Sequence, residues 1–264
     1  MNNKMNIKTT NQWLTELILN LGLVLCAISF QTQAIAASSD EIQVYDDAIN
    51  EPGEFNVDVH TNYVVSGIKD SEYPKEIPAN HDFRVTPEFA YGLTKNLEGG
   101  MYLPAIRSSN GDWYLEGVKF RLKYLADHEK TGMYLGMNFE LGKVSHRTAE
   151  QNWNLEARPI VGYRTDEWNL AINPILGFAV SGNNHTPTFE PAFKIGHKLT
   201  NKTWINLENY SDFGPLNQMR SHVQETYLTA DTEMFGHDLN IGIGHGWTQE
   251  ANDWTLKAIF NIPL

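Results

Sequence analysis

The stretch that most constrains the fold is 168–180, WNLAINPILGFAV, in which apolar residues alternate with polar or small ones. The even-numbered positions are apolar and are interrupted only by Pro174. They are Trp168, Leu170, Ile172, Leu176, Phe178 and Val180. The odd-numbered positions carry polar or small residues, apart from Ile175. A period of two is typical of a strand with one apolar face. Because the pattern recurs in segments of about ten residues, the length of a tilted transmembrane strand, it predicts a membrane β-barrel.

Further segments with this alternation predict an all-β fold, a single closed antiparallel transmembrane β-barrel of about twelve strands. They are 54–64, 82–93, 97–106, 117–125, 133–141, 153–163, 168–180, 189–199, 203–211, 223–234, 239–247 and 254–264. An even number suits single-chain bacterial barrels, and long loops alternate with short turns, which predicts the short turns on the periplasmic side. Because proline donates no ladder hydrogen bond, bulges or broken pairing are expected at Pro87, Pro104, Pro159, Pro174 and Pro191.

The charged residues test this fold against a soluble two-sheet β protein. Within the predicted strands, the charged residues occupy the positions that alternate with the apolar ones. They are Asp58, Arg84, Glu88, Glu98, Lys119, Arg121, Lys123, Glu140, Glu156, Arg158, Glu190, Lys194, Glu208, Asp231 and Lys257. An Arg or Lys at the middle of a lipid-facing surface costs about 2–4 kcal/mol, so this sorting favours the barrel. Glu116 falls on a position that the alternation assigns to the apolar face. It lies near a loop end, where the energetic cost of a lipid-facing charge is smaller. Six tryptophans near strand ends resemble aromatic girdles, namely Trp113, Trp153, Trp168, Trp204, Trp247 and Trp254.

The N-terminal region reads as a secretory signal peptide over residues 1–36. Lys4 and Lys8 precede a mostly apolar stretch, and 34–36 (AIA) supplies a small-x-small cleavage pattern. An uncleaved anchor helix is the alternative, although the unbroken apolar core is too short to span a membrane. The only cysteine, Cys26, lies in this region after Leu25, which argues against a lipoprotein. Residues 37–53 are polar and acidic and predict a periplasmic lead-in that tucks under or into the barrel at 54–264.

Several runs of the chain resemble a family of largely uncharacterised proteobacterial outer-membrane proteins. They are EIQVYDDAINEPGEFNVDVHTNYV, TPEFAYGLTKNLEGGMYLP, GVKFRLKYL, RPIVGY, NPILGFAV, FEPAFKIG and LENYSDFGPL. The family is loosely similar to the outer-membrane barrels linked with the MetA pathway of phenol degradation. The resemblance covers nearly the whole chain after the signal, and it implies a barrel in the outer membrane of a Gram-negative cell. It brings no catalytic motif.

The inward charges are the candidate functional residues. Lys119, Arg121 and Lys123 form a basic ladder on one strand, and Glu98 and Glu140 lie on the neighbouring strands. The predicted lumen or constriction residues are Arg84, Glu88, Glu98, Lys119, Arg121, Lys123, Glu140, Glu156, Arg158, Glu190, Lys194 and Glu208. They predict either a charged constriction that selects solutes or ion pairs that brace the wall. Because twelve strands lie between filled eight-stranded barrels and water-filled porins, both remain open.

Three function classes follow, and passive passage of small solutes through a porin-like channel is the leading one. A closed-lumen structural or adhesive barrel that acts through its loops is the second. A membrane-edge lipid hydrolase is the third and weakest, because Ser145 and His146 are adjacent and strand neighbours point to opposite faces. Expected partners are outer-membrane lipid and a small solute. The net charge of −12 argues against nucleic-acid binding.

No metal site and no cofactor are expected. The nine histidines are scattered without a close metal-ligand spacing, at His60, His81, His128, His146, His185, His197, His222, His237 and His245. The alternating glycines Gly242, Gly244 and Gly246 lack the strand–helix context of a phosphate loop, and are expected to leave room inside the barrel.

Overall fold

The computed structural model of this chain describes residues 41–182 and 185–263, and there every regular element is a β-strand. The predicted signal peptide, residues 1–36, lies outside the described residues. The strands are β1 (Phe55–Ser66), β2 (Phe83–Thr94), β3 (Leu97–Tyr102), β4 (Ala105–Arg107), β5 (Trp113–Leu115), β6 (Gly117–Leu125), β7 (Gly132–Val144), β8 (Trp153–Arg164), β9 (Trp168–Asn173), β10 (Leu176–Ala179), β11 (Thr188–Phe189), β12 (Ala192–Lys198), β13 (Trp204–Asp212), β14 (Val223–Met234), β15 (His237–Gly246) and β16 (Trp254–Pro263). No helix in the described residues is long and apolar enough to cross a membrane.

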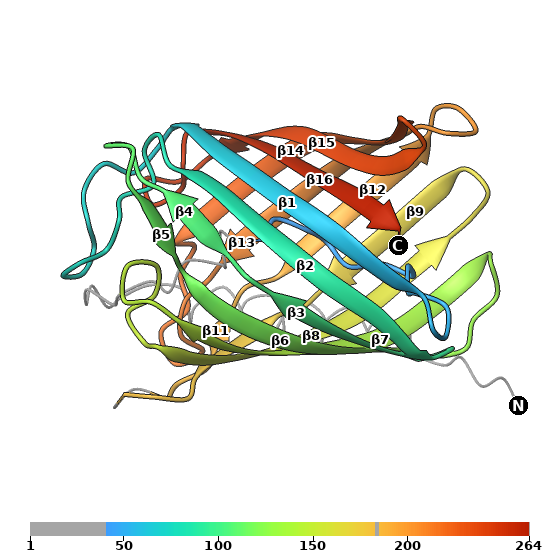
Figure 1. Ribbon diagram of the computed structural model, residues 1–264, viewed down its shortest axis with the longest axis horizontal. Helices are drawn as coiled ribbons and strands as arrows, with labels where there is room; N and C mark the ends of the chain where they lie inside the picture. Colours follow the sequence, from blue (N-terminus) through green and yellow to red (C-terminus); the bar gives the residue numbers. More distant parts are fainter. Residues whose placement is uncertain (1–40, 183–184, 264) are drawn as a thin grey trace, which may run out of the picture. The chain divides into compact units, whose positions relative to one another are not determined.

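These strands close into a twelve-stranded antiparallel β-barrel (Figure 1). Four barrel strands are each divided in two, because β3 continues as β4, β5 as β6, β9 as β10 and β11 as β12. β1 pairs with β2 on one side and with β16 on the other, so the sheet has no free edge along this seam. The predicted fold class is therefore confirmed.

Prolines explain three of the four divisions. Pro104 separates β3 from β4, Pro174 separates β9 from β10, and Pro191 separates β11 from β12. Pro87 and Pro159 lie inside continuous β2 and β8, and the expected break in pairing is found there on one side of each strand. The ladder with β1 runs through Pro87 and the ladder with β7 runs through Pro159, so each strand stays continuous in spite of the missing donor.

The alternation of faces is also confirmed. On β6, Phe120, Leu122 and Tyr124 are 55%, 45% and 49% exposed, whereas the residues between them are nearly inaccessible. Outward apolar side chains of this kind surround the barrel, and the polar parity faces the interior. Five of the six predicted girdle tryptophans are exposed, namely Trp113, Trp153, Trp168, Trp247 and Trp254.

Glu116 departs from the predicted alternation and points into the lumen. It is only 2% exposed, and Arg84 Nη1 donates a hydrogen bond to its Oε1 at 3.0 Å. The reason is a break in the strand, since β5 ends at Leu115 and β6 begins at Gly117. Gly117 has a φ of +155°, and a Cβ there would lie 2.2 Å from the Lys143 carbonyl oxygen. Glycine therefore allows the kink that turns the carboxylate inward.

A close contact inside the barrel gives a first prediction. A Cβ on Gly162 would lie 2.0 Å from Cζ of Tyr134, which is fully buried and donates to Asn169 Oδ1 at 2.9 Å. Gly162→Val is expected to lower the free energy of unfolding by about 1–3 kcal/mol, because the tyrosine ring must move. Urea titration in lipid vesicles measures this loss. Gly99→Val is the matched control, with no atom nearer than 3.5 Å to the new Cβ. Equal losses in both variants would refute the explanation.

Candidate functional site

Residues 41–50, here called the lumen segment, pass through the barrel interior, and an exposed turn at 51–54 then leads into β1. Figure 1 draws the segment in blue, inside the ring of strands. Cations on the wall bind its backbone carbonyls. Lys257 Nζ donates to Ile42 O at 2.8 Å, Arg158 Nη1 to Gln43 O at 3.1 Å, and Lys123 Nζ to Ala48 O at 2.5 Å. Because these donors come from β16, β8 and β6, the segment is held from several sides.

Tyr45 is the centre of this attachment. Its N–H donates to Asn173 Oδ1 at 2.7 Å, and Asn173 Nδ2 donates to its carbonyl at 3.0 Å. Its hydroxyl lies 2.6 Å from the Tyr102 hydroxyl, and the Arg158 guanidinium stacks 4.4 Å from its ring centre. Tyr45 and Val44 pack in a buried apolar cluster with wall residues such as Ile160. The segment is thus bound by polar contacts and by apolar packing.

Two consecutive carboxylates of the segment are bound by wall residues. Lys194 Nζ donates to Asp46 Oδ2 at 2.6 Å, and Asn169 Nδ2 donates to the same oxygen at 3.0 Å. Arg164 Nε donates to Asp47 Oδ2 at 2.6 Å. Burial alone would raise the pKa of the Asp46 carboxyl, but Lys194 and Arg164 outweigh burial and hold that pKa well below its usual range. Asp46 is therefore charged at neutral pH.

The structure places all twelve predicted lumen residues in the barrel interior. Glu156 is partly exposed, and the other eleven are buried: Arg84, Glu88, Glu98, Lys119, Arg121, Lys123, Glu140, Arg158, Glu190, Lys194 and Glu208. They do not form one ring. Instead they fall into separate ion-pair groups and into the contacts of the lumen segment.

The basic ladder in particular has no common role. Arg121 is bound by wall carboxylates, with Nε 2.5 Å from Glu88 Oε1 and Nη1 2.7 Å from Glu98 Oε1. Lys123 binds the lumen segment through its carbonyl at Ala48. Lys119 lines a cavity nearer the long loops. The ladder therefore combines bracing and segment binding on one strand.

Residues of the lumen segment were not among the predicted site residues. Tyr45, Asp46 and Asp47 lie in a stretch without strand periodicity, so the alternation could not assign them a face. The bulky tyrosines Tyr102, Tyr134 and Tyr227 do occupy inward positions of predicted strands, and they are a sequence signal of a partly filled interior.

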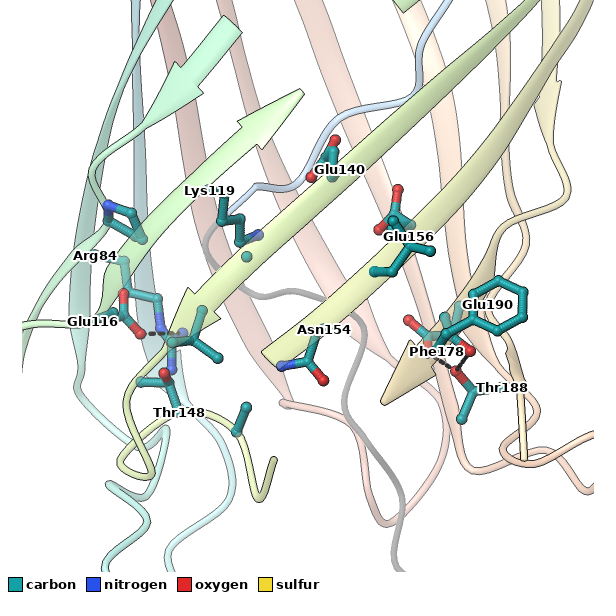
Figure 2. Close-up of a pocket in the computed structure, with 16 residues that line it drawn as sticks. Arg84, Glu116, Lys119, Glu140, Thr148, Asn154, Glu156, Phe178, Thr188 and Glu190 are labelled. Carbon is teal, nitrogen blue, oxygen red and sulfur yellow. Dashed lines mark hydrogen bonds and ion pairs between the residues drawn. The ribbon is translucent and has the colours of Figure 1, made fainter. Parts of the chain in front are cut away.

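Cavities remain on both sides of the segment. Two of about 120 and 100 Å³ lie toward the long loops, and one of about 440 Å³ lies toward the short turns. Figure 2 shows the first, into which Lys119, Glu140 and Glu156 project from β6, β7 and β8. Arg84, Glu116 and Glu190 complete its charged lining. The interior is therefore polar, charged and incompletely filled.

Other candidate chemistry finds little support in the geometry. Ser145 and His146 lie in the loop after β7, where His146 Nδ1 contacts Glu150 O at 2.9 Å and Ser145 Oγ accepts from Arg147 N at 3.2 Å. The two side chains share no hydrogen bond in the described part of the chain. Across residues 41–182 and 185–263, no group of three His, Cys, Asp or Glu side chains is arranged to hold a metal ion.

Comparison with known proteins agrees with this architecture. No family model matches the sequence, and no curated protein matches it. The COG4313 outer membrane channel from Pseudomonas putida F1 is similar in structure, with a TM-score of 0.63 and 11% identity over 85% of this chain and all of that one. KdgM porin has a TM-score of 0.54 and 8% identity over 79% and 99% of the two chains. NanC porin has a TM-score of 0.51 and 10% identity over 79% and 98%.

Fold and polar lumen together define an outer-membrane β-barrel that resembles channels and porins. At these identities the likeness shows the fold alone. The resemblance to barrels linked with phenol degradation stays a prediction, because no family model matches.

Proposed function

We propose that the protein is a passive channel for small solutes and has no enzymatic activity. The observation that carries this proposal is the charged, incompletely filled lumen, with cavities on both sides of the lumen segment. Lumens lined by charged side chains are typical of channels that select solutes. The similar structures described as a channel or as porins support the proposal. Outer-membrane lipid surrounds the apolar belt, and a small solute occupies the lumen in transit.

A closed structural or adhesive barrel is the second candidate. The observation in its favour is the lumen segment itself, whose Val44 and Tyr45 are buried in the middle of the barrel. In this alternative the segment is a permanent filling and the long loops carry the function.

Single-channel recording in planar bilayers separates the two candidates. Purified, folded protein is expected to give discrete current steps above the lipid baseline. Heat-modifiable mobility on gels checks in advance that the barrel is folded. Folded protein that gives no current steps would contradict the channel and favour the closed barrel.

A further inference from the structure

The cavities toward the long loops have an excess of carboxylates. The first is lined by Glu116, Glu140, Glu156 and Glu190 against two cations, Arg84 and Lys119. The second shares Arg84, Glu156 and Glu190 with it and adds four further carboxylates but only one further cation. A mobile ion in this part of the lumen is therefore surrounded by more negative than positive groups.

Two of the cations here, Arg84 and Arg158, are paired with carboxylates, whereas the hydrogen bonds that Glu190 and Glu140 accept from described residues come from neutral donors. Arg84 Nη1 binds Glu116 at 3.0 Å, and Arg158 Nε binds Glu156 at 2.7 Å. By contrast, Glu190 accepts from the Thr188 hydroxyl at 2.5 Å. Glu140 accepts from Asn138 Nδ2 at 2.8 Å and from the Tyr45 hydroxyl at 3.4 Å. A neutral donor satisfies a carboxylate oxygen without cancelling its charge.

Glu41 supplies an independent observation in the same region. Its side chain is 1% exposed, and it lines the cavity that Glu156 and Glu190 also line. Arg158 Nη1 is 3.7 Å from its Oε1, while its Oε2 accepts no hydrogen bond from the described residues. A buried carboxylate oxygen without a donor needs a positive or hydrogen-bonding partner from the lumen.

The cavity toward the short turns repeats this imbalance. Six carboxylates and three lysines line it. Each lysine has a carboxylate partner, in the pairs Lys194–Asp46, Lys257–Glu208 and Lys202–Glu233. Asp58 and Asp231 instead accept from asparagine amides, at 2.6 and 2.9 Å. Both approaches to the lumen segment are thus acidic.

We infer that the lumen passes cations in preference to anions, and that Glu140, Glu156 and Glu190 set this preference. The inference rests on the proposed channel function. Carboxylates that line a pore concentrate cations and repel anions. Two members of the basic ladder do not oppose them, because Arg121 is bound by two wall carboxylates and Lys123 binds the lumen segment. The third, Lys119, is outnumbered in the first cavity, where four carboxylates face it and Arg84. The matching solutes are inorganic cations and small organic cations.

The reversal potential across a KCl gradient at pH 10 tests the inference. Wild-type channels are expected to favour K⁺ over Cl⁻. The triple variant Glu140→Gln, Glu156→Gln, Glu190→Gln is expected to lower the K⁺/Cl⁻ permeability ratio by about three- to tenfold, since three nearby charges are removed. A control variant loses the same charge outside the lumen, by Asp70→Asn, Glu129→Gln and Glu167→Gln, which are all exposed. Its ratio should stay at the wild-type value.

The outcomes separate the two proposals. Current without cation preference in wild type would overturn the inference and leave the channel standing. A triple variant with the wild-type ratio would overturn the role of the three carboxylates. If the triple variant does not fold, Glu190→Gln alone is measured, and its ratio must still fall below wild type. Folded wild-type protein without any current would refute the channel itself, and the inference with it.

Discussion

Replacing residues 41–50 with ten Gly and Ser residues is expected to raise the single-channel conductance by about threefold or more, because the lumen segment then loses its attachment. The change removes the Tyr45 anchor and the two aspartates that bind Lys194 and Arg164. The wall is expected to stay closed, since the ladder between β1 and β16 uses none of these residues. Chain length is kept, so β1 remains tethered as before. Planar-bilayer recording gives the conductance directly.

A matched replacement of residues 69–76 by Gly and Ser is the control, because that stretch belongs to the long loop between β1 and β2. Its conductance should remain near the wild-type value. If the 41–50 variant folds and conducts no better than this control, the lumen segment does not obstruct the pathway. Equal increases in both variants would point instead to a general loosening of the barrel.

Arg121→Met is expected to cause the largest loss of stability, about 3–5 kcal/mol of unfolding free energy, because it leaves two buried carboxylates without their cation. Glu88 and Glu98 both bind the Arg121 guanidinium, and all three side chains are at most 5% exposed. Glu88 also contacts His60 Nε2 at 3.0 Å, so the loss extends to β1. Urea titration in lipid vesicles measures the change.

A second variant tests whether the loss comes from unpaired charge. Adding Glu88→Gln and Glu98→Gln to Arg121→Met removes the two orphaned charges, and should recover part of the lost stability. Lys95→Met is the control, since Lys95 on the β2–β3 turn and Asp127 on the β6–β7 turn form an exposed pair, and no measurable loss is expected. A loss in Arg121→Met no larger than in this control would contradict the bracing role. An unchanged loss in the combined variant would show that packing, rather than charge, is responsible.

The barrel could be predicted from the sequence because its main signal is local. A period of two assigns each residue of a strand to one face, and the half-exposed Phe120 and Leu122 on β6 follow that assignment. The same rule fails at Glu116, where a glycine kink changes the phase between β5 and β6. It also makes no prediction for residues 41–50, which are not a strand and are placed in the lumen only by long-range contacts.

The candidate site was predictable as a set of inward charges but not as a set of pairs. Arg121 binds Glu88, which lies 33 residues earlier in the chain. Such a pair depends on the relative stagger of β2, β3 and β6, and alternation alone carries no information on stagger. For this reason the basic ladder suggested a constriction, whereas the structure divides it between bracing and binding of the lumen segment.

The attachment of Lys257 has a consequence for assembly. This lysine lies on β16, the last strand, and it binds both Glu208 on β13 and the carbonyl of Ile42, which precedes the first strand. The first and last parts of the barrel are therefore joined in two ways. β1 and β16 form a ladder, and the Lys257 ammonium group on β16 binds the segment that precedes β1. A slip of β16 by one residue along β1 would turn Lys257 toward lipid and break both contacts. The contact between the lumen segment and Lys257 thus favours the correct register of β16, the strand that closes the barrel.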